Sequence, residues 1–169
     1  MDEHIDDEYK KLGMVQDKLT QMRSDKILLE VMFFELNRAK RFNHPLSFLL
    51  IEPKLSVPYE NNLLHLYPIL KQVSMMLRQY TRYVDISIRM GRQLLLILTE
   101  TDPDGAKVVE SKLKDFLEGE PLPLWDEFPM PTVSLLSASA SFPKDGNTPE
   151  EVLQTLQDRL EEQRLKQGN

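Results

Sequence analysis

Two arginines flank one aspartate in a short stretch of the chain: Arg82, Asp85 and Arg89. A guanidinium group offers a planar fork of N–H donors that suits a phosphate or a guanine edge, and a carboxylate accepts hydrogen bonds from guanine N–H groups. Asp85 and Arg89 lie four residues apart in a predicted strand, so we expect their side chains to share one face, with Arg82 just before it. The alternative is that Arg82 caps the preceding helix and pairs with Asp85 on the surface. In either case Arg82→Ala is expected to change stability by less than about 1 kcal/mol, as a surface substitution.

Several other kinds of catalytic or metal site lack the residues or motifs that they require. The sequence contains no cysteine, which excludes thiol nucleophiles, Fe–S clusters and cysteine-ligated zinc. The three histidines, His4, His44 and His65, are too far apart for metal-ligand spacing. The motifs G-x-x-x-x-G-K-[ST], G-x-G-x-x-G, H-E-x-x-H and G-x-S-x-G are all absent. We therefore expect no cofactor and no dedicated metal site.

The composition of the chain is that of one globular domain, with 169 residues, 41% hydrophobic and 28% charged. The net charge of −6 argues against broad binding to nucleic acid or to an anionic membrane. Residues 1–11 are acidic where a signal peptide is basic, and no apolar run approaches the ~20 residues that span a bilayer. We expect a cytoplasmic protein with no nucleic-acid partner and no membrane span in this chain.

The elements that position these residues follow from hydrophobic periodicity. We expect, in order, a strand at 46–52 buried on both faces, an amphipathic helix at 63–80, a half-covered strand at 84–90, a buried strand at 94–98, a helix at 103–119, a strand at 132–140 and a helix from 149. Residues 91–93 are of hairpin length, with a glycine for a positive φ. The order predicts an α/β (α+β) fold with a ferredoxin-like βαββαβ core, an antiparallel-rich sheet with the core's helices on one face, and flanking helices around it.

The first 22 residues form a predicted N-terminal lead-in helix. Apolar residues recur there at alternating steps of seven, three and four: Ile5, Leu12, Val15, Leu19 and Met22. This seam fits either a helix packed on its own domain or the end of a coiled-coil stalk that joins a partner chain. A second helix is expected to begin after Ser24 as N-cap and to stop near Pro45. The predicted organisation is therefore a helix at 1–22 and a domain at 23–169.

Short motifs spread over residues 17–169 resemble those of GGDEF, or diguanylate cyclase, domains. They are D-x-L-T at 17–20, E-L-N-R-A-K-R at 35–41, P-L-S-F-L-L-I at 45–51, R-x-x-D-x-x-x-R-x-G at 82–91, T-V-S at 132–134, F-P-x-D-G at 142–146 and T-P-E at 148–150. Their order and spacing make the chain similar to this bacterial signalling family. The resemblance implies GTP as substrate, metal ions held by acids on the hairpin turn and at the end of the first strand, and an R-x-x-D site where cyclic di-GMP docks.

The signature hairpin departs from the family. Where the family reads G-G-D-E-F, this chain reads Gly91, Arg92, Gln93, Leu94 and Leu95, and a register one residue earlier, from Met90, carries no acid on the turn either. Glu52 stands at the first-strand position and could still bind a cation. The guanine-recognition region near residues 60–62 is also altered. Metal-assisted phosphoryl transfer depends on neutralising charge on the phosphate oxygens, so we predict that the domain is not an enzyme.

The expected function is that of a degenerate, catalytically inactive GGDEF-like domain that acts as a signalling or protein–protein interaction module. The expected partners are a second copy in a homodimer or a larger signalling or motility assembly, with cyclic di-GMP as a candidate ligand at Arg82, Asp85 and Arg89. One alternative is a slow magnesium-dependent nucleotide hydrolase that uses Glu52. Another is a purely structural dimerisation domain.

Overall fold

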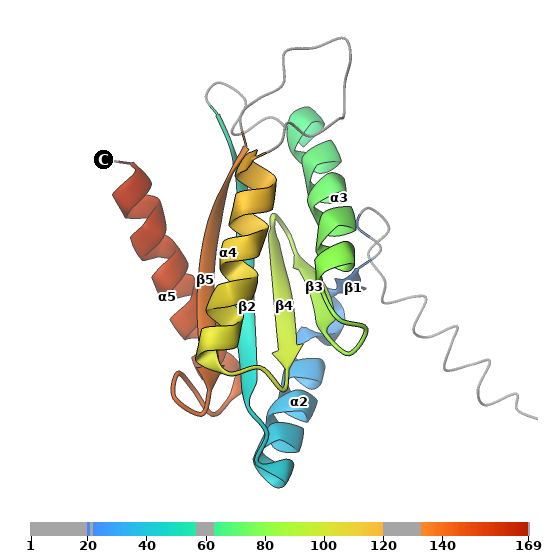
Figure 1. Cartoon of the computed structure of the whole chain (residues 1–169), viewed down its shortest axis with the longest axis vertical. Helices are drawn as coiled ribbons and strands as arrows, with labels where there is room; N and C mark the ends of the chain where they lie inside the picture. The colour runs from blue at the N-terminus through green and yellow to red at the C-terminus, as the bar shows by residue number, and fades with distance from the viewer. Residues whose placement is uncertain (1–19, 21, 57–62, 120–132, 169) are drawn as a thin grey trace, which may run out of the picture.

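The computed structural model of the chain describes residues 20, 22–56, 63–119 and 133–168 (Figure 1). Its elements are β1 (Arg23–Ser24), the 3₁₀ helix η1 (Asp25–Ile27), α2 (Leu28–Phe42), β2 (Leu46–Leu55), α3 (Leu63–Tyr80), β3 (Ile86–Met90), β4 (Gln93–Thr99), α4 (Pro103–Gly119), β5 (Val133–Phe142) and α5 (Pro149–Gln167). No helix in these ranges is both long and apolar enough to cross a bilayer.

The strands form one sheet in the order β1-β3-β4-β2-β5. The pairs β3–β4, β4–β2 and β2–β5 are all antiparallel, and the two-residue strand β1 lies parallel to β3 at the edge. The run β2-α3-β3-β4-α4-β5 is the predicted βαββαβ core, in which each helix connects two strands that have another strand between them. The predicted ferredoxin-like fold is therefore confirmed.

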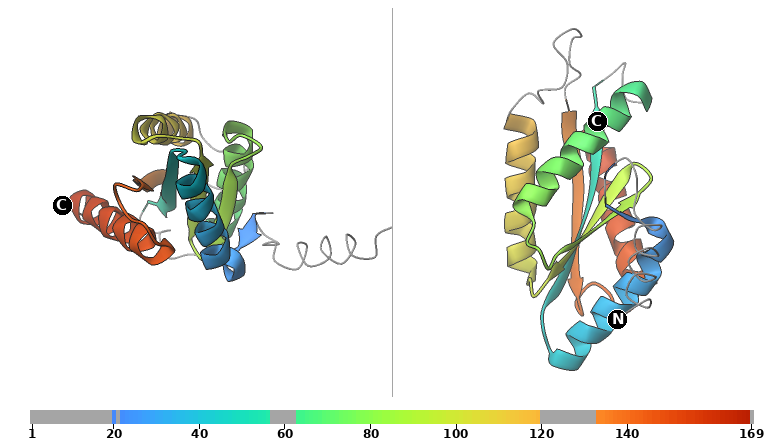
Figure 2. Two further views of the ribbon diagram at one scale, coloured as in Figure 1. Left: turned by 90° about the horizontal axis from the view of Figure 1, so that it is seen from below. Right: turned by 90° about the vertical axis from the view of Figure 1, so that its right-hand side faces the viewer.

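Helices cover both faces of the sheet (Figure 2). The core helices α3 and α4 lie on one face, as expected, and α2 and α5 cover the other. Alternate residues of the central strand β2 supply the two layers: Leu49 and Ile51 pack with α3 and α4, whereas Phe48 and Leu50 pack with α2 and α5. All four side chains are fully buried, as predicted for a strand covered on both sides.

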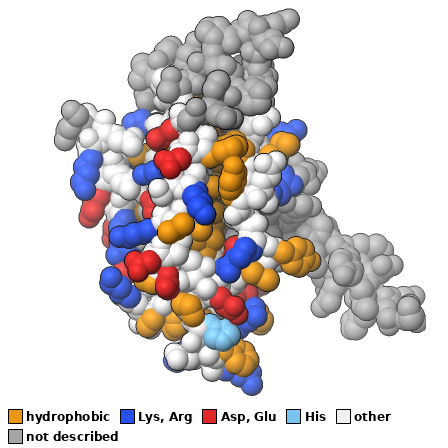
Figure 3. Space-filling view, viewed as in Figure 1, with side chains coloured by type: hydrophobic (Ala, Val, Ile, Leu, Met, Phe, Trp, Pro, Cys, Tyr) orange, Lys and Arg blue, Asp and Glu red, His pale blue; other side chains and the backbone are white. Residues whose placement is uncertain are grey.

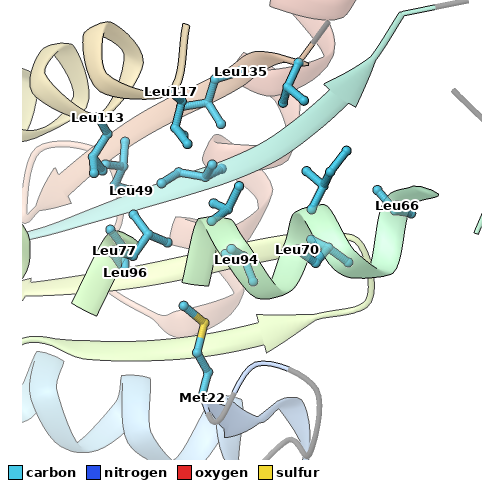
Figure 4. Packing of buried hydrophobic residues seen from close by; sticks show 14 of the residues in the cluster. Met22, Leu49, Leu66, Leu70, Leu77, Leu94, Leu96, Leu113, Leu117 and Leu135 are labelled. Atoms are coloured by element: carbon cyan, nitrogen blue, oxygen red, sulfur yellow. The ribbon is translucent and has the colours of Figure 1, made fainter. Parts of the chain in front are cut away.

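The layer under α3 and α4 is made largely of leucines (Figure 4). Leu70 and Leu77 of α3 point toward Leu94 and Leu96 of β4. The labelled side chains of α4 approach the same cluster from beside β5. Met22 reaches the same cluster from the N-terminal side and is 3% exposed. The end of the predicted apolar seam therefore packs inside its own domain.

Two boundaries near the N-terminus differ from expectation. Ser24 does not cap a helix but lies in β1, where it pairs with Arg89 of β3. The helix α2 begins at Leu28, after Ile27, whose side chain makes no capping hydrogen bond. The remaining seam residues, Ile5, Leu12, Val15 and Leu19, lie outside the described part of the chain, so the boundary at residue 22 stays a prediction.

The β3–β4 hairpin turns on two residues, Gly91 and Arg92, because Met90 pairs with Gln93. Gly91 has a φ of +63°, which glycine adopts without steric cost. The strand before the turn is shorter than predicted and begins at Ile86 rather than residue 84. Asp85 instead belongs to a turn in which its backbone N–H donates to the carbonyl of Arg82 (3.0 Å).

Candidate functional site

The structure brings Glu52 and Gln93 together on the α5 side of the sheet. The β2–β4 ladder runs as far as Ile51 opposite Leu94, so Glu52 and Gln93 follow as the next residues of their strands. Nε2 of Gln93 donates to Oε1 of Glu52 at 3.3 Å. These are the two positions at which the family resemblance implies metal-binding acids, and one of them carries an amide.

The carboxylate of Glu52 is paired with a cation from α5. Nη2 of Arg164 lies 2.5 Å from Oε2 of Glu52, and the side chain of Glu52 is only 16% exposed. Arg164 also pairs with Glu161 of the same helix. The hydrogen bond from Arg164 to Glu52 is the main cause of a raised pKa at Arg164. A positively charged guanidinium therefore neutralises the carboxylate that a metal ion would need.

A second residue of α5 holds the amide of Gln93. Nε2 of Gln157 donates to Oε1 of Gln93 at 2.8 Å, and Nε2 of Gln93 donates back to Oε1 of Gln157 at 3.2 Å. This reciprocal pair ties the start of β4 to α5. Sequence reasoning missed both Gln157 and Arg164. No sequence feature near Glu52 or Gln93 indicates that a helix more than 60 residues later in the chain will pack against them.

Arg82 and Asp85 meet at the other end of the hairpin. The side chain of Asp85 is 4% exposed and accepts hydrogen bonds from the Arg82 guanidinium (Nε 3.2 Å, Nη2 3.1 Å), the Arg82 backbone N–H (3.0 Å) and the Thr99 backbone N–H (3.2 Å). Nη2 of Arg82 also donates to the Thr99 carbonyl and to Oγ1 of Thr101 (2.9 Å). The pair fastens the α3–β3 turn to the end of β4.

The outer side of Arg82 is open. Its side chain is 52% exposed, and within the described residues its Nη1 has no hydrogen-bond partner. The next residue, Tyr83, is fully exposed (104%), and Val84 is 59% exposed. An aromatic ring thus stands in solvent beside a half-exposed guanidinium, a feature that sequence reasoning did not single out.

Arg89 is not part of this cluster. It lies near the hairpin turn, where its Nε donates to the carbonyl of Gly91 (2.9 Å) and its guanidinium carbon sits 5.7 Å from the centre of the Tyr67 ring. Four residues of extended chain separate it from Asp85 by about 13 Å. Because Asp85 precedes β3, the expected strand face shared by Asp85 and Arg89 does not form.

No protein-family model matches this sequence, and no curated protein matches it. Solved structures match the fold over most of the chain. A sensory box/GGDEF family protein from Caulobacter crescentus is 17% identical, with 92% of this chain and 99% of that chain covered at a TM-score of 0.77. The coiled coil and GGDEF domain of DgcB from the same organism, in complex with c-di-GMP, is 11% identical, with 96% and 86% covered at 0.83.

The diguanylate cyclase SiaD from Pseudomonas aeruginosa, in complex with its activator SiaC, is 18% identical, with 96% of this chain and 66% of that chain covered at a TM-score of 0.78. This chain has the GGDEF-domain fold. The resemblance predicted from short motifs is thus confirmed at the level of the fold. Sequence identities of 11–18% support the shared fold alone.

The residues at the hairpin of this GGDEF fold do not suit a magnesium ion. Mg²⁺ is usually held by one or two carboxylates together with phosphate and water oxygens. Here one carboxylate is present, Glu52, and its two oxygens are bonded to Arg164 and Gln93. Within the described ranges, no three histidine, aspartate or glutamate side chains gather closely enough to hold a metal. The altered guanine-recognition residues 60–62 lie outside those ranges.

Proposed function

We propose that this protein is a catalytically inactive GGDEF-like domain that works as a signalling and interaction module in the cytoplasm. The observation that carries the proposal is the ion pair between Glu52 and Arg164, with the neutral Gln93 beside it. Metal ions that bridge the phosphates neutralise much of the charge that develops in phosphoryl transfer. Here Arg164 occupies the carboxylate that would hold such an ion and is itself engaged by Glu52 and Glu161, so this site offers the phosphates no cation.

Arg92 supports the same proposal. It is an exposed residue at the second turn position, where the family resemblance implies a glycine that lets the nucleotide approach the backbone. A long side chain there obstructs the approach. The domain therefore departs from the family at its metal position and at its turn.

An assay with GTP and either Mg²⁺ or Mn²⁺ tests the proposal. We expect neither cyclic di-GMP nor inorganic phosphate above a control without protein. Formation of either product would overturn the proposal, and phosphate alone would support the slow hydrolase. Restoring G-G-D-E-F at residues 91–95 is also expected to fail, because the guanine-recognition region near residues 60–62 is altered and Arg164 still pairs with Glu52.

The cause of inactivity can be tested by metal binding. Gln93→Glu with Arg164→Ala adds an acid and frees Glu52, so this variant should bind Mn²⁺ at least about tenfold more tightly than the parent, measured by electron paramagnetic resonance. The matched control is Gln93→Glu with Lys166→Ala, which removes an exposed cation elsewhere on α5. Equal Mn²⁺ affinity in the two double variants would show that Arg164 does not block the site.

Cyclic di-GMP is the second candidate partner, favoured by the open side of Arg82 and the exposed ring of Tyr83. Charge-assisted hydrogen bonds contribute roughly 1.5–3 kcal/mol each, and stacking on an aromatic ring roughly 1–3 kcal/mol per base. Micromolar affinity needs about 8 kcal/mol. Arg82 and Tyr83 could supply much of it, with the remainder from a second protomer.

Calorimetric titration with cyclic di-GMP tests this candidate. Tyr83→Ser should weaken binding about tenfold without altering stability, because its side chain is fully exposed. Val84→Ser is the matched control, since it changes the neighbouring exposed side chain and removes no aromatic ring. Absence of heat at several hundred micromolar ligand would exclude the nucleotide and leave the interaction module alone.

A further inference from the structure

The outer face of α2 carries large hydrophobic side chains in solvent. Leu29 is 50% exposed, Phe33 62% and Phe34 64%, and they lie within two turns of one another. They oppose the buried stripe of the same helix, which packs on the sheet through Leu28, Met32, Leu36 and Ala39. Contiguous exposed apolar groups of this size mark an interaction surface on a soluble domain.

The charges on this face are divided between its two ends. Glu30 lies in the first turn of α2, and Lys40 and Arg41 lie in the last. Among the described residues none of the three forms a salt bridge, whereas Arg38 is occupied by Glu35. Arg41 instead lies over the ring of Phe42, 5.4 Å from its centre. The face therefore runs from an acid, through two phenylalanines, to a pair of bases.

We propose that this face binds a second copy of the chain, with the two α2 helices antiparallel about a twofold axis. A surface that meets itself across such an axis must be self-complementary. An axis at the level of residues 35 and 36 places Glu30 opposite the partner's Arg41, and by symmetry the same pair forms again at the other end. The two Phe34 side chains then lie about 4.5 Å apart along the helix axis, within ring contact.

The charge pattern favours a second copy over other occupants. Two molecules of net charge −6 repel each other at long range, so association needs local attraction. A parallel arrangement would set Lys40 and Arg41 against their own counterparts, whereas the antiparallel arrangement pairs Arg41 with the partner's Glu30 and places Lys40 one residue from that pair. The proposal rests on the interaction role proposed above and identifies its surface.

Sedimentation of the full chain, from low micromolar to several hundred micromolar, tests the proposal. We expect a reversible dimer. Glu30→Arg and Arg41→Glu should each raise the dimer dissociation constant about tenfold or more, because each creates two like-charge pairs. The double variant Glu30→Arg with Arg41→Glu should restore dimerisation, since the reversed charges pair again across the axis. Phe34→Ser should weaken the dimer with no change in fold, as its side chain is exposed.

Matched controls come from α5, where Glu150 is an exposed first-turn acid and Lys166 an exposed last-turn base. Glu150→Arg and Lys166→Glu make the same charge changes at equivalent helix ends and should leave the dimer intact. A monomeric parent, single reversals without effect, or a double reversal that does not recover would each overturn the proposal. The proposal would also be overturned if the double variant Leu12→Lys with Leu19→Lys lost the dimer while the α2 variants retained it. None of these results bears on the catalytic proposal, which product formation decides.

Discussion

Several carboxylates in the described part of the chain are buried beside an arginine that reaches in from the surface. Glu52, Asp85 and Asp145 have side chains 16%, 4% and 12% exposed, whereas their partners Arg164, Arg82 and Arg159 are 39%, 52% and 43% exposed. Arginine suits this role because its long aliphatic stem spans the depth and its planar fork matches the carboxylate. Removing the arginine leaves a buried charge without its partner, which is costly.

Arg82 illustrates how much the arginine partner of a buried carboxylate contributes to stability. Arg82→Ala removes the guanidinium bonds to Asp85, Thr99 and Thr101, so we expect a loss of roughly 1.5–3 kcal/mol in the free energy of unfolding, measured by urea denaturation. This exceeds the surface-substitution value of less than about 1 kcal/mol expected from the sequence. The comparison variant is Lys107→Ala, an exposed cation on α4. If Arg82→Ala lowered the free energy of unfolding no more than Lys107→Ala does, this result would contradict a structural role for Arg82.

At the scale of elements, the turn between β5 and α5 is held by side-chain bonds to the backbone. Thr148 accepts from the N–H of Glu151 (3.2 Å) as a helix cap, and Glu151 accepts from the N–H of Asn147 (2.7 Å). Asp145 accepts from the N–H of Ser141 (2.9 Å) and pairs with Arg159 (2.7 Å). These contacts orient α5, which in turn carries Arg164 to Glu52.

Asp145 makes this turn sensitive to acid. Burial alone raises the pKa of its carboxyl, but the hydrogen bonds from Arg159 and Ser141 outweigh burial and hold the pKa below its usual 3.8. The stabilisation is complete above about pH 4 and declines as pH falls through the lowered pKa. Asp145→Asn should therefore lower the free energy of unfolding by about 1 kcal/mol at pH 7, measured by urea titration. The difference in this free energy between variant and parent should shrink below pH 4. Asp158→Asn, at an exposed helix position, should show no such convergence.

The hairpin turn depends on backbone conformation at Gly91. Nothing lies within 4 Å of a Cβ added there, so Gly91→Ala meets no clash, and its cost comes from the φ of +63° alone. We expect a loss of about 1–2 kcal/mol for alanine and less for asparagine, which tolerates this region better. Denaturation midpoints of the two variants check the order. Equal losses would show that the turn itself relaxes.

At the scale of the whole molecule, two hydrophobic layers share one sheet. Strands β2 and β4 place residues in both layers, so neither layer can melt while the other keeps its strands. In Figure 3, acidic and basic side chains are interspersed over the face that carries α4. This face therefore shows no separation of acids from bases like that along α2.

The shared sheet predicts one cooperative unfolding transition. Leu113→Ala, on the buried face of α4, and Leu160→Ala, on the buried face of α5, should each lower the free energy of unfolding by about 2–5 kcal/mol. The two losses should add to within about 0.5 kcal/mol in the double variant. Circular dichroism should follow a single transition in every case. Two separated transitions in either single variant would show that the layers fold independently.

Most of the fold could be predicted from the sequence because the signals are local. Apolar runs and alternations identified the four long strands, a glycine and short spacing identified the hairpin, and Pro149 after Thr148 marked the start of α5. The sequence predicted a connection of three residues, 91–93, whereas the pairing of Met90 with Gln93 leaves only two residues in the turn. The resemblance to GGDEF domains rested on short motifs in matching order and spacing, and the solved structures similar to this chain confirm the fold that it implied.

The sequence by itself determined the helices and strands from α2 to α5, their order and the absence of an acid on the hairpin turn. Only the tertiary structure decided that Arg164 neutralises Glu52, 112 residues away, and that Asp85 is buried against Arg82. It also decided that Arg89 lies at the opposite end of its strand and that large apolar side chains of α2 remain uncovered. The physical reason is the distance along the chain over which each feature is set. Helix and strand periodicity depends on residues that are close in the sequence. The partner of a buried charge or of an apolar helix face depends instead on how whole helices pack across the sheet, which no local sequence pattern specifies.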